Sequence, residues 1–215
     1  MFVSNRMTAN PFTLTANATV ADASETMRTH KFRRLPIVEN GKLVGIITDR
    51  DLREVSPSPA TTLSIFELNY LLAKMMVKDI MKKDVLTIQA NSTIEEAALL
   101  MYKNKIGGLV VVDDQDSVIG VITETDIFKT FVDVMGITQG KTTRVTIDVT
   151  DKVGILCDIT GIFKDLSMNI SSLVSYPLED GSYELVIRAQ VNNSDALVEH
   201  LSSAGYPVKH ITQIS

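Results

Sequence analysis

One stretch of the sequence, Gly45-Ile46-Ile47-Thr48-Asp49-Arg50-Asp51-Leu52, returns further along as Gly120-Val121-Ile122-Thr123-Glu124-Thr125-Asp126-Ile127. In each copy a glycine leads a short apolar strand into a threonine, and an aspartate follows three residues later, in the predicted first turn of a helix. A junction of this kind offers free backbone amides, a hydroxyl and a carboxylate. It is therefore a candidate site for a small polar ligand.

The similarity between the two copies extends well beyond this stretch. Leu35 aligns with Leu109, 74 residues later, whereas the repeated stretch itself is offset by 75. The extra residue falls where a turn absorbs it, because Asn40-Gly41 is a two-residue hairpin signal and the second copy has the longer polar loop 113–116. The change of offset supports a strand, a turn and a strand in each copy.

Each copy is predicted to have the order β-α-β-β-α, and two units of about 60 residues are expected to pack together because one alone buries little surface. In the first copy the elements are an extended lead at 11–15, a helix from Thr19, and strands at 35–39 and 42–48. In the second copy they are a helix from Thr93, which forms a capping box with Glu96, and strands at 109–113 and 118–123. Between the copies, Ser56-Pro57-Ser58-Pro59 predicts a linker, and an amphipathic helix is expected from Ser64 onward.

A different pattern begins after the second copy, beyond a segment at 136–141 that contains two glycines. Alternating apolar residues at 145–149 predict a strand, and 155–166 reads as a helix. The segments 170–176 and 183–189 are expected to pair, and a helix at 194–203 and a strand at 208–211 follow them. The predicted order is β-α-β-β-α-β.

The paired copies resemble two cystathionine-β-synthase-type (CBS) motifs, which fold together as a Bateman module. The resemblance rests on two imperfect copies that agree in order, spacing and the ending Gly-apolar-apolar-Thr-x-x-Asp. We expect an α+β protein in which residues 1–135 form the tandem CBS module and 136–141 a linker. Within the module, repeat 1 covers 1–55, a linker and helix cover 56–77, and repeat 2 covers 78–135. The resemblance implies that the cleft between the repeats binds an adenine nucleotide such as AMP, ADP or ATP.

The chemistry of the repeated stretch agrees with that expectation. A ribose presents two neighbouring hydroxyl donors, which the carboxylates of Asp51 and Asp126 can accept. Thr48 and Thr123 lie where a strand becomes a helix, whose amides favour an anionic group. The alternative is that Thr-x-x-Asp is only a capping box, in which threonine and acid satisfy backbone amides.

The copies differ where a phosphate needs cations, because Arg33-Arg34 in the first aligns with Gly107-Gly108 in the second. We therefore expect two unequal sites, with Arg34 as the phosphate contact. The apolar strand residues Ile37-Val38 and Val111-Val112 are expected to flank the purine.

Residues 142–215 resemble an ACT domain, a small ferredoxin-like regulatory fold that often binds amino acids at a subunit interface. Asp151-Lys152-Val153-Gly154-Ile155-Leu156 and Asn169-Ile170 carry this resemblance. Asp151, Gly154 and Asn169 are the candidate effector residues: Gly154 lets a backbone approach a ligand at a helix start, and Asn169 offers hydrogen bonds. Val153 departs from the family pattern, where proline often precedes the glycine. The alternative is a domain that only dimerises.

Composition argues against several other classes of protein. The formal charge of −5 comes without a basic run, so neither nucleic acid nor a membrane is an expected partner. No apolar run reaches the roughly 18 residues of a membrane span, and the single cysteine, Cys157, suits the cytoplasm and is expected to be buried. The three histidines lie at no metal-ligand spacing, and no catalytic motif is present. We expect no metal, no required cofactor and no enzymatic activity.

The combination of a CBS pair, the insert at 64–72 and an ACT-like domain resembles the acetoin-utilisation protein B family. That resemblance implies a regulatory role connected with acetoin catabolism. The expected mechanism is that a nucleotide closes the cleft and reorients the ACT-like domains of a homodimer, which regulates an unknown target protein. The alternatives are an interaction scaffold without a ligand and a nucleotide-processing enzyme.

Overall fold

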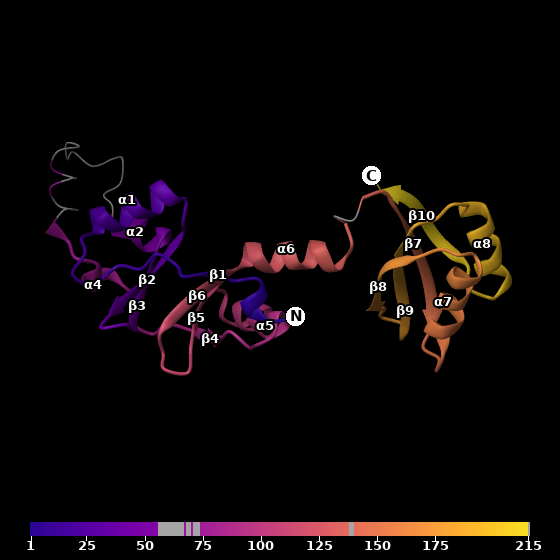
Figure 1. Cartoon of the computed structure of the whole chain (residues 1–215), viewed down its shortest axis with the longest axis horizontal. Coiled ribbons are helices and arrows are strands. Elements are labelled where there is room, and N and C mark those ends of the chain that lie inside the picture. The colour runs from indigo at the N-terminus through magenta and orange to yellow at the C-terminus, as the bar shows by residue number, and fades with distance from the viewer. Residues whose placement is uncertain (56–66, 68–69, 71–73, 138–139, 215) are drawn as a thin grey trace. The chain divides into compact units, whose positions relative to one another are not determined.

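The computed structural model describes residues 1–55, 67, 70, 74–137 and 140–214 (Figure 1). The chain forms two compact units, Met1–Ile127 and Phe128–Ser215. The α+β fold expected from the sequence is confirmed, with the paired repeats in the first unit and β-α-β-β-α-β in the second. The amphipathic helix expected from Ser64 onward lies outside the described residues.

The first unit contains both copies of the repeat. Its elements are, in the first copy, η1 (Val3–Asn5), β1 (Thr8–Ala9), α1 (Val20–His30), β2 (Arg34–Glu39), β3 (Lys42–Thr48) and α2 (Asp49–Val55). In the second copy they are α4 (Val77–Ile80), β4 (Thr87–Gln89), α5 (Ile94–Asn104), β5 (Gly108–Val112), β6 (Val118–Thr123) and the start of α6 (Glu124–Val134). The described strands form a β1-β6-β5-β4 sheet and a β2-β3 hairpin.

Local sequence signals set these elements. The capping box predicted at Thr93 is present, with its Oγ1 accepting from the Glu96 amide at 3.1 Å, and Thr19 caps α1 in the same way. Between β2 and β3 the chain turns at Asn40 and Gly41, both with positive φ, as the two-residue hairpin requires.

Each repeat is completed by a short segment that belongs, in sequence, to the other repeat. β1 of the first copy pairs with β6 of the second, and Lys82 makes the equivalent bridge to Ile46. Val3 of η1 is fully buried in the core of the second repeat, and Val77 of α4 is fully buried in the core of the first. The repeats therefore cannot separate without exposing apolar side chains to water.

This exchange explains why a glycine opens the repeated stretch. A Cβ at Gly45 would lie 2.6 Å from the Sδ of Met81, and a Cβ at Gly120 would collide with the Sδ of Met7. The two methionines come from the exchanged segments. Each glycine thus leaves room for the segment that arrives from the other repeat.

The two copies differ in their leading strand. In the second copy β4 pairs in parallel with β5 over three residues, whereas in the first the lead contributes one parallel bridge, from Leu14 to Ile37. The expected β-α-β-β-α order is present in both, but the first strand of the first copy is reduced to that bridge.

The second unit is an antiparallel sheet covered on one face by two helices (Figure 1). Its elements are β7 (Thr142–Thr150), α7 (Ile155–Asp165), β8 (Ile170–Pro177), β9 (Ser182–Ala189), α8 (Ser194–Ser203) and β10 (Val208–Ile214), and the strand order is β10-β7-β9-β8. Alternate strand residues, including Val145, Ile147 and Ile187, are fully buried against the helices. The other residues of each strand point to the face that the helices leave open.

One sequence prediction about this unit is wrong. Cys157 is exposed on α7 rather than buried, because the buried face of that helix is formed by Ile159 and Phe163. The apolar residues around Cys157 suggested burial, but Leu156 is also 46% exposed.

The exchange of segments predicts where a core mutation acts. Val77→Ala should lower the free energy of unfolding of the first unit by about 2 kcal/mol, because it removes two buried methyl groups and leaves a cavity in the first repeat. Urea unfolding followed by circular dichroism measures this loss. Val153→Ala, at a fully exposed valine, is the control and should change stability by less than about 0.5 kcal/mol. An effect of Val77→Ala no larger than the control would contradict the exchange.

Candidate functional site

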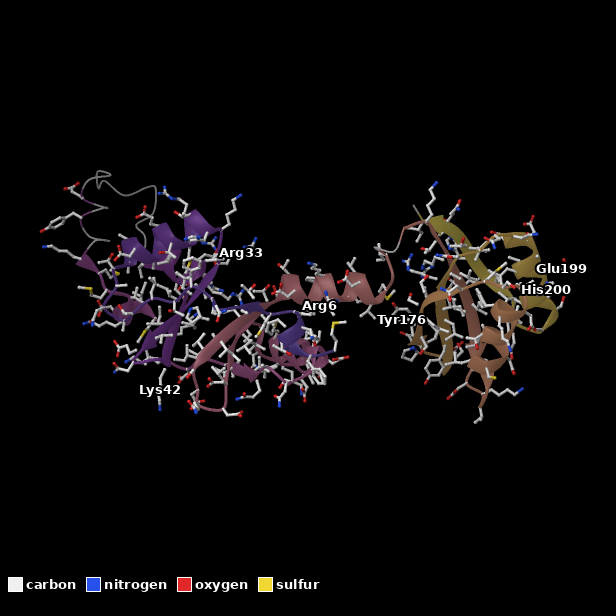
Figure 2. All side chains as sticks on the ribbon, in the orientation of Figure 1. Arg6, Arg33, Lys42, Tyr176, Glu199 and His200 are labelled. Atoms are coloured by element: carbon white, nitrogen blue, oxygen red, sulfur yellow. The ribbon has the colours of Figure 1, made fainter. Side chains whose placement is uncertain are left out.

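A cavity of about 540 Å³ opens in the first unit. Both repeats line it, and it lies beside the junction between β6 and α6, where the second copy of the repeated stretch ends. The lining residues are Thr8, Ala9, Asn10, Pro11, Phe12, Lys31, Phe32, Arg33, Arg34, Leu35, Gly107, Val121, Thr123, Glu124 and Thr125. Figure 2 labels Arg33, one of the three lining cations. Of the predicted nucleotide-site residues, Arg34 and Thr123 belong to this lining, whereas Thr48, Asp51 and Asp126 do not.

Arg34 reaches from the first repeat onto the glycine pair of the second. A Cβ at Gly108 would collide with Nη1 of Arg34, and a Cβ at Gly107 would lie 2.9 Å from its Nη2 and 3.0 Å from Oε2 of Glu124. Arg33-Arg34 and Gly107-Gly108 are aligned positions of the two copies. Because the two glycines have no side chains, the guanidinium of Arg34 occupies the space above them.

The charge of Arg34 is set by both copies. Burial lowers the pKa of its guanidinium, and the nearby carboxylates of Glu124, Asp49 and Asp126 act in the opposite direction. Asp49 and Glu124 are again aligned positions of the repeat. Arg34 keeps its positive charge at neutral pH, and it is a cation of the lining that contacts both repeats.

The two predicted aspartates act as helix caps. Oδ2 of Asp51 accepts from the Thr48 amide at 2.8 Å and from its hydroxyl at 2.5 Å. Oδ2 of Asp126 accepts from the Thr123 amide at 2.8 Å and from its hydroxyl at 2.7 Å. The capping box that the sequence left open as an alternative is therefore present in both copies.

The two copies differ at the second carboxylate oxygen. Oδ1 of Asp51 is 3.0 Å from Nζ of Lys82, and the Asp51 side chain is 6% exposed. In the other copy the residue aligned with Lys82 is Thr8, which carries no amine and lines the cavity. The Thr48–Asp51 junction is thus covered by an ion pair, while the cavity opens beside the Thr123–Asp126 junction.

Aromatic residues, which sequence reasoning missed, form one wall of the cavity. Phe12 and Phe32 line it with ring centroids 5.5 Å apart, and His30 stacks on Phe12 at 4.2 Å. The prediction that Ile37-Val38 and Val111-Val112 flank a purine is not supported, since they are absent from the lining and Ile37 and Val111 are fully buried core residues. The signal was available: Phe12 and Phe32 align with the aliphatic residues Leu86 and Ile106.

A second cavity, of about 420 Å³, lies in the second unit at the start of α7. Its lining residues are Val149, Asp151, Lys152, Gly154, Ile155, Leu156, Ser175, Tyr183 and Leu185. Gly154 has φ +90°, a left-handed conformation that glycine adopts without strain, and it precedes the first helical residue. Asn169 lies outside this lining, just before the opposite end of β8, so one chain does not bring all three predicted effector residues together.

Two kinds of feature are absent from the described residues. No group of three or more His, Cys, Asp or Glu residues could hold a metal ion in the part of the chain that the structure describes. Among the same residues, no helix is both long and apolar enough to cross a membrane.

Two protein families match the sequence. The CBS domain family matches residues 3–58 and 77–133, and the ACT domain family matches residues 143–205. A CBS domain-containing protein of Dictyostelium discoideum is 35% identical over 136 residues, which are 63% of this chain and 94% of that protein. Inosine-5'-monophosphate dehydrogenase of Bacillus subtilis is 39% identical over 124 residues, 56% of this chain but only 22% of the enzyme.

Solved structures match the first unit as well. A putative acetoin utilization protein (AcuB) from Vibrio cholerae is 30% identical, with a TM-score of 0.54 over 65% of this chain and 96% of that one. CBSX2 in complex with AMP is 27% identical, with a TM-score of 0.52 over 62% and 97%. The CBS domain pair of protein MJ0100, in complex with 5'-methylthioadenosine and S-adenosyl-L-methionine, is 30% identical, with a TM-score of 0.51 over 61% and 99%.

The ion pair at the covered junction predicts an acid-sensitive contribution to stability. Burial raises the pKa of Asp51, but hydrogen bonds from Thr48 and Lys82 outweigh it and bring the pKa below its ordinary value. Protonation therefore favours the unfolded chain, so the contribution is present above about pH 4 and is lost as the pH falls through the folded-state pKa.

Asp51→Asn should weaken the pH dependence of unfolding below about pH 5, and Asp51→Ala should cost about 1–2 kcal/mol at neutral pH because the cap is lost as well. Lys82→Met, which keeps the cap and removes the ion pair, is the matched variant and should cost less. Urea unfolding between about pH 3 and 7 measures each effect. An unchanged acid dependence in Asp51→Asn would contradict the assignment.

Proposed function

We propose that this chain, which belongs to the CBS-domain family and carries a C-terminal ACT domain, is a ligand-sensing regulatory protein. Its first unit would bind an adenine nucleotide. The observation that carries the proposal is the cavity that both repeats line, with Arg34 seated on the glycine pair at its wall. The complexes of CBSX2 with AMP and of MJ0100 with two adenosine compounds support this ligand class.

The residues suggest how such a ligand would bind. Arg34 would pair with a phosphate group. The hydroxyl of Thr123 already donates to Asp126, so its oxygen would accept a hydrogen bond from the ligand at the start of α6. The rings of Phe12 and Phe32 offer apolar surface to a purine. Asp126 would accept from the ribose hydroxyls, as Asp51 would in the other copy.

The two sites are expected to bind a nucleotide unequally, because the aspartate of the first copy is paired with a lysine. A ribose at Asp51 must break the ion pair with Lys82, whereas Thr8 holds the aligned position beside Asp126. We therefore propose that the cavity beside Thr123 is the working site and that each chain binds about one AMP.

The Arg34 assignment gives a direct test. Calorimetric titration of the full chain with AMP should show binding that weakens at least about tenfold in Arg34→Met, because a charged hydrogen bond to phosphate is lost. Arg50→Met is the matched control, since Arg50 is an arginine that pairs with Glu54 and lies outside the lining. Equal weakening in both variants, or in neither, would remove the role of Arg34.

A second variant tests the inequality of the sites. Lys82→Thr copies Thr8 into the second repeat and should raise the number of AMP molecules bound per chain above that of the wild type. Two AMP molecules bound to the wild type would show that the Lys82–Asp51 ion pair does not close its site.

We further propose that the second unit binds an amino acid in the cavity beside Gly154. The positive end of the helix dipole at the start of α7 suits a carboxylate, and Asp151 offers a negative charge to an ammonium group. Equilibrium dialysis of the full chain against the twenty amino acids tests this. Retention of one of them should fall at least about fivefold in Asp151→Asn and stay unchanged in Asp195→Asn, an exposed aspartate on α8. No retention of any amino acid would leave dimerisation as the role of this unit.

Homodimerisation stays a proposal, supported by large apolar side chains that the single chain leaves exposed. Leu99 and Tyr102 on α5 are 50% and 83% exposed, and Phe128 and Phe131 on α6 are 68% and 54% exposed. Exposed apolar groups of this size often mark an interface between protein chains. Sedimentation equilibrium gives the mass in solution.

Three classes of function, a sensor, an enzyme and a scaffold, are distinguished by what the protein does to its nucleotide. A sensor returns its nucleotide unchanged, an enzyme yields a product from AMP, ADP or ATP, and a scaffold retains a protein partner without either ligand. Inosine-5'-monophosphate dehydrogenase shares the CBS part of the chain, but the match covers only 22% of that enzyme. We propose the non-enzymatic role, and a connection with acetoin catabolism supported by the likeness to the Vibrio cholerae protein.

A further inference from the structure

The open face of the sheet in the second unit carries two arginines side by side. Arg144 of β7 is directly opposite Arg188 of β9, which is in turn opposite Ser172 of β8. The neighbours Val145 and Ile187 face the helices and are fully buried in the core, so the arginines point to the other face. Directly opposite residues of like charge repel each other.

Arg188 is buried, and two of its three guanidinium nitrogens have no hydrogen-bond partner. It is 5% exposed, and its Nε and Nη1 are inaccessible to solvent and make no hydrogen bond. Burial, and then the charge of Arg144, lower the pKa of its guanidinium. Nη1 of Arg144 donates to the hydroxyl of Thr146 at 2.6 Å, which brings no negative charge to the pair. Within the described residues, neither arginine forms an ion pair.

The same face of the sheet also carries a charge cluster that has its own counter-ion. Asp148 and Glu184 are also cross-strand neighbours of like charge, and Nζ of Lys209 lies between them at 3.1 and 3.2 Å. The acidic pair therefore has its counter-ion within the fold. The basic pair has none among the described residues.

Met135 and Gly136, which precede β7, lie on this face beside Arg188. The backbone carbonyl of Met135 accepts from the Ser172 hydroxyl at 3.0 Å, and a Cβ at Gly136 would lie 3.6 Å from Cδ of Arg188. Tyr176, which Figure 2 labels, comes from β8 on the same face, with its hydroxyl 3.9 Å from Sδ of Met135. The backbone at Met135 and Gly136 thus lies against the side chain of Arg188, and it is held there by the hydroxyl of Ser172.

Burying guanidinium donors without partners costs free energy, and the like charge of the partly buried Arg144 beside them adds to that cost. Arginine forms its strongest pairs with carboxylate and phosphate oxygens, through two parallel hydrogen bonds. We propose that Arg144 and Arg188 form a binding site for a phosphate group on the open face of the second unit. A phosphate carries between one and two negative charges at neutral pH and enough oxygens to accept from both guanidinium groups. This site is separate from both cavities and independent of the nucleotide proposal.

The test uses inorganic phosphate and the full chain. Thermal unfolding is measured in phosphate and in chloride of equal ionic strength, since a ligand that binds only the folded state raises the midpoint temperature. Phosphate should raise the midpoint of the wild type and of Arg50→Met. The increase should disappear in Arg188→Met and in Arg144→Met, with at least about tenfold weaker binding by titration.

A spectroscopic measurement keeps the proposal testable if a variant folds poorly. In chain labelled with ¹⁵N-arginine, phosphate should shift the Nε–H signals of Arg144 and Arg188 and leave that of Arg50 in place. AMP is the second probe, and it is applied to Arg34→Met, in which the proposed nucleotide site is weakened. Arginine signals that shift with AMP indicate a nucleotide phosphate as the natural source, and signals that shift only with inorganic phosphate indicate free phosphate. Unmoved arginine signals, or an equal response to phosphate in wild type and both methionine variants, would overturn the proposal. So would a wild-type chain that self-associates through Arg188 without binding phosphate.

Discussion

The first unit depends on one steric constraint, which is that two glycines of the second repeat leave room for an arginine of the first. Arg34 occupies the space above Gly107 and Gly108 so closely that a Cβ at Gly108 would collide with its guanidinium. Any larger residue there would expel the cation from the meeting of the repeats. The position of this charge on the cavity wall therefore depends on two aligned positions that differ between the copies, rather than on either one alone.

Duplication also explains why the unit holds together. Each copy gives a short segment to the other, with Val3 and Val77 completing the opposite cores and Met7 and Met81 lying on the leading glycines. These contacts form between residues far apart in the sequence, so they make the two repeats one cooperative body. A ligand bound in a cavity that both repeats line stabilises the arrangement that places them together, which is the physical requirement for a sensor.

The sequence predicted the local features well, because they arise from neighbours in the chain. The capping box at Thr93, the turn at Asn40 and Gly41 and the pairing of β8 with β9 all follow from residues close together in the sequence. The exchanged segments and the crossing of Arg34 could not be predicted in this way, since no local pattern tells which partner a short segment will choose. The predicted site residues differ in the same way, according to the kind of sequence signal that indicated them. Arg34 stood out because the copies differ there, whereas Asn169 was chosen by motif alone and lies away from the Gly154 cavity.

The two Thr-x-x-Asp junctions share the same cap but differ in the residue that lies beside it. The Thr-x-x-Asp cap is needed in both copies, since it satisfies the amides at the start of α2 and α6. The cap therefore persists whether or not a ligand binds beside it, and its presence alone says little about binding. What distinguishes the junctions is the residue that arrives from the exchanged segment, Lys82 in one and Thr8 in the other. An amine next to a buried carboxylate satisfies the acid internally, whereas a threonine leaves the neighbouring space open. The structural difference between the two junctions thus resides in the incoming segment rather than in the repeated motif.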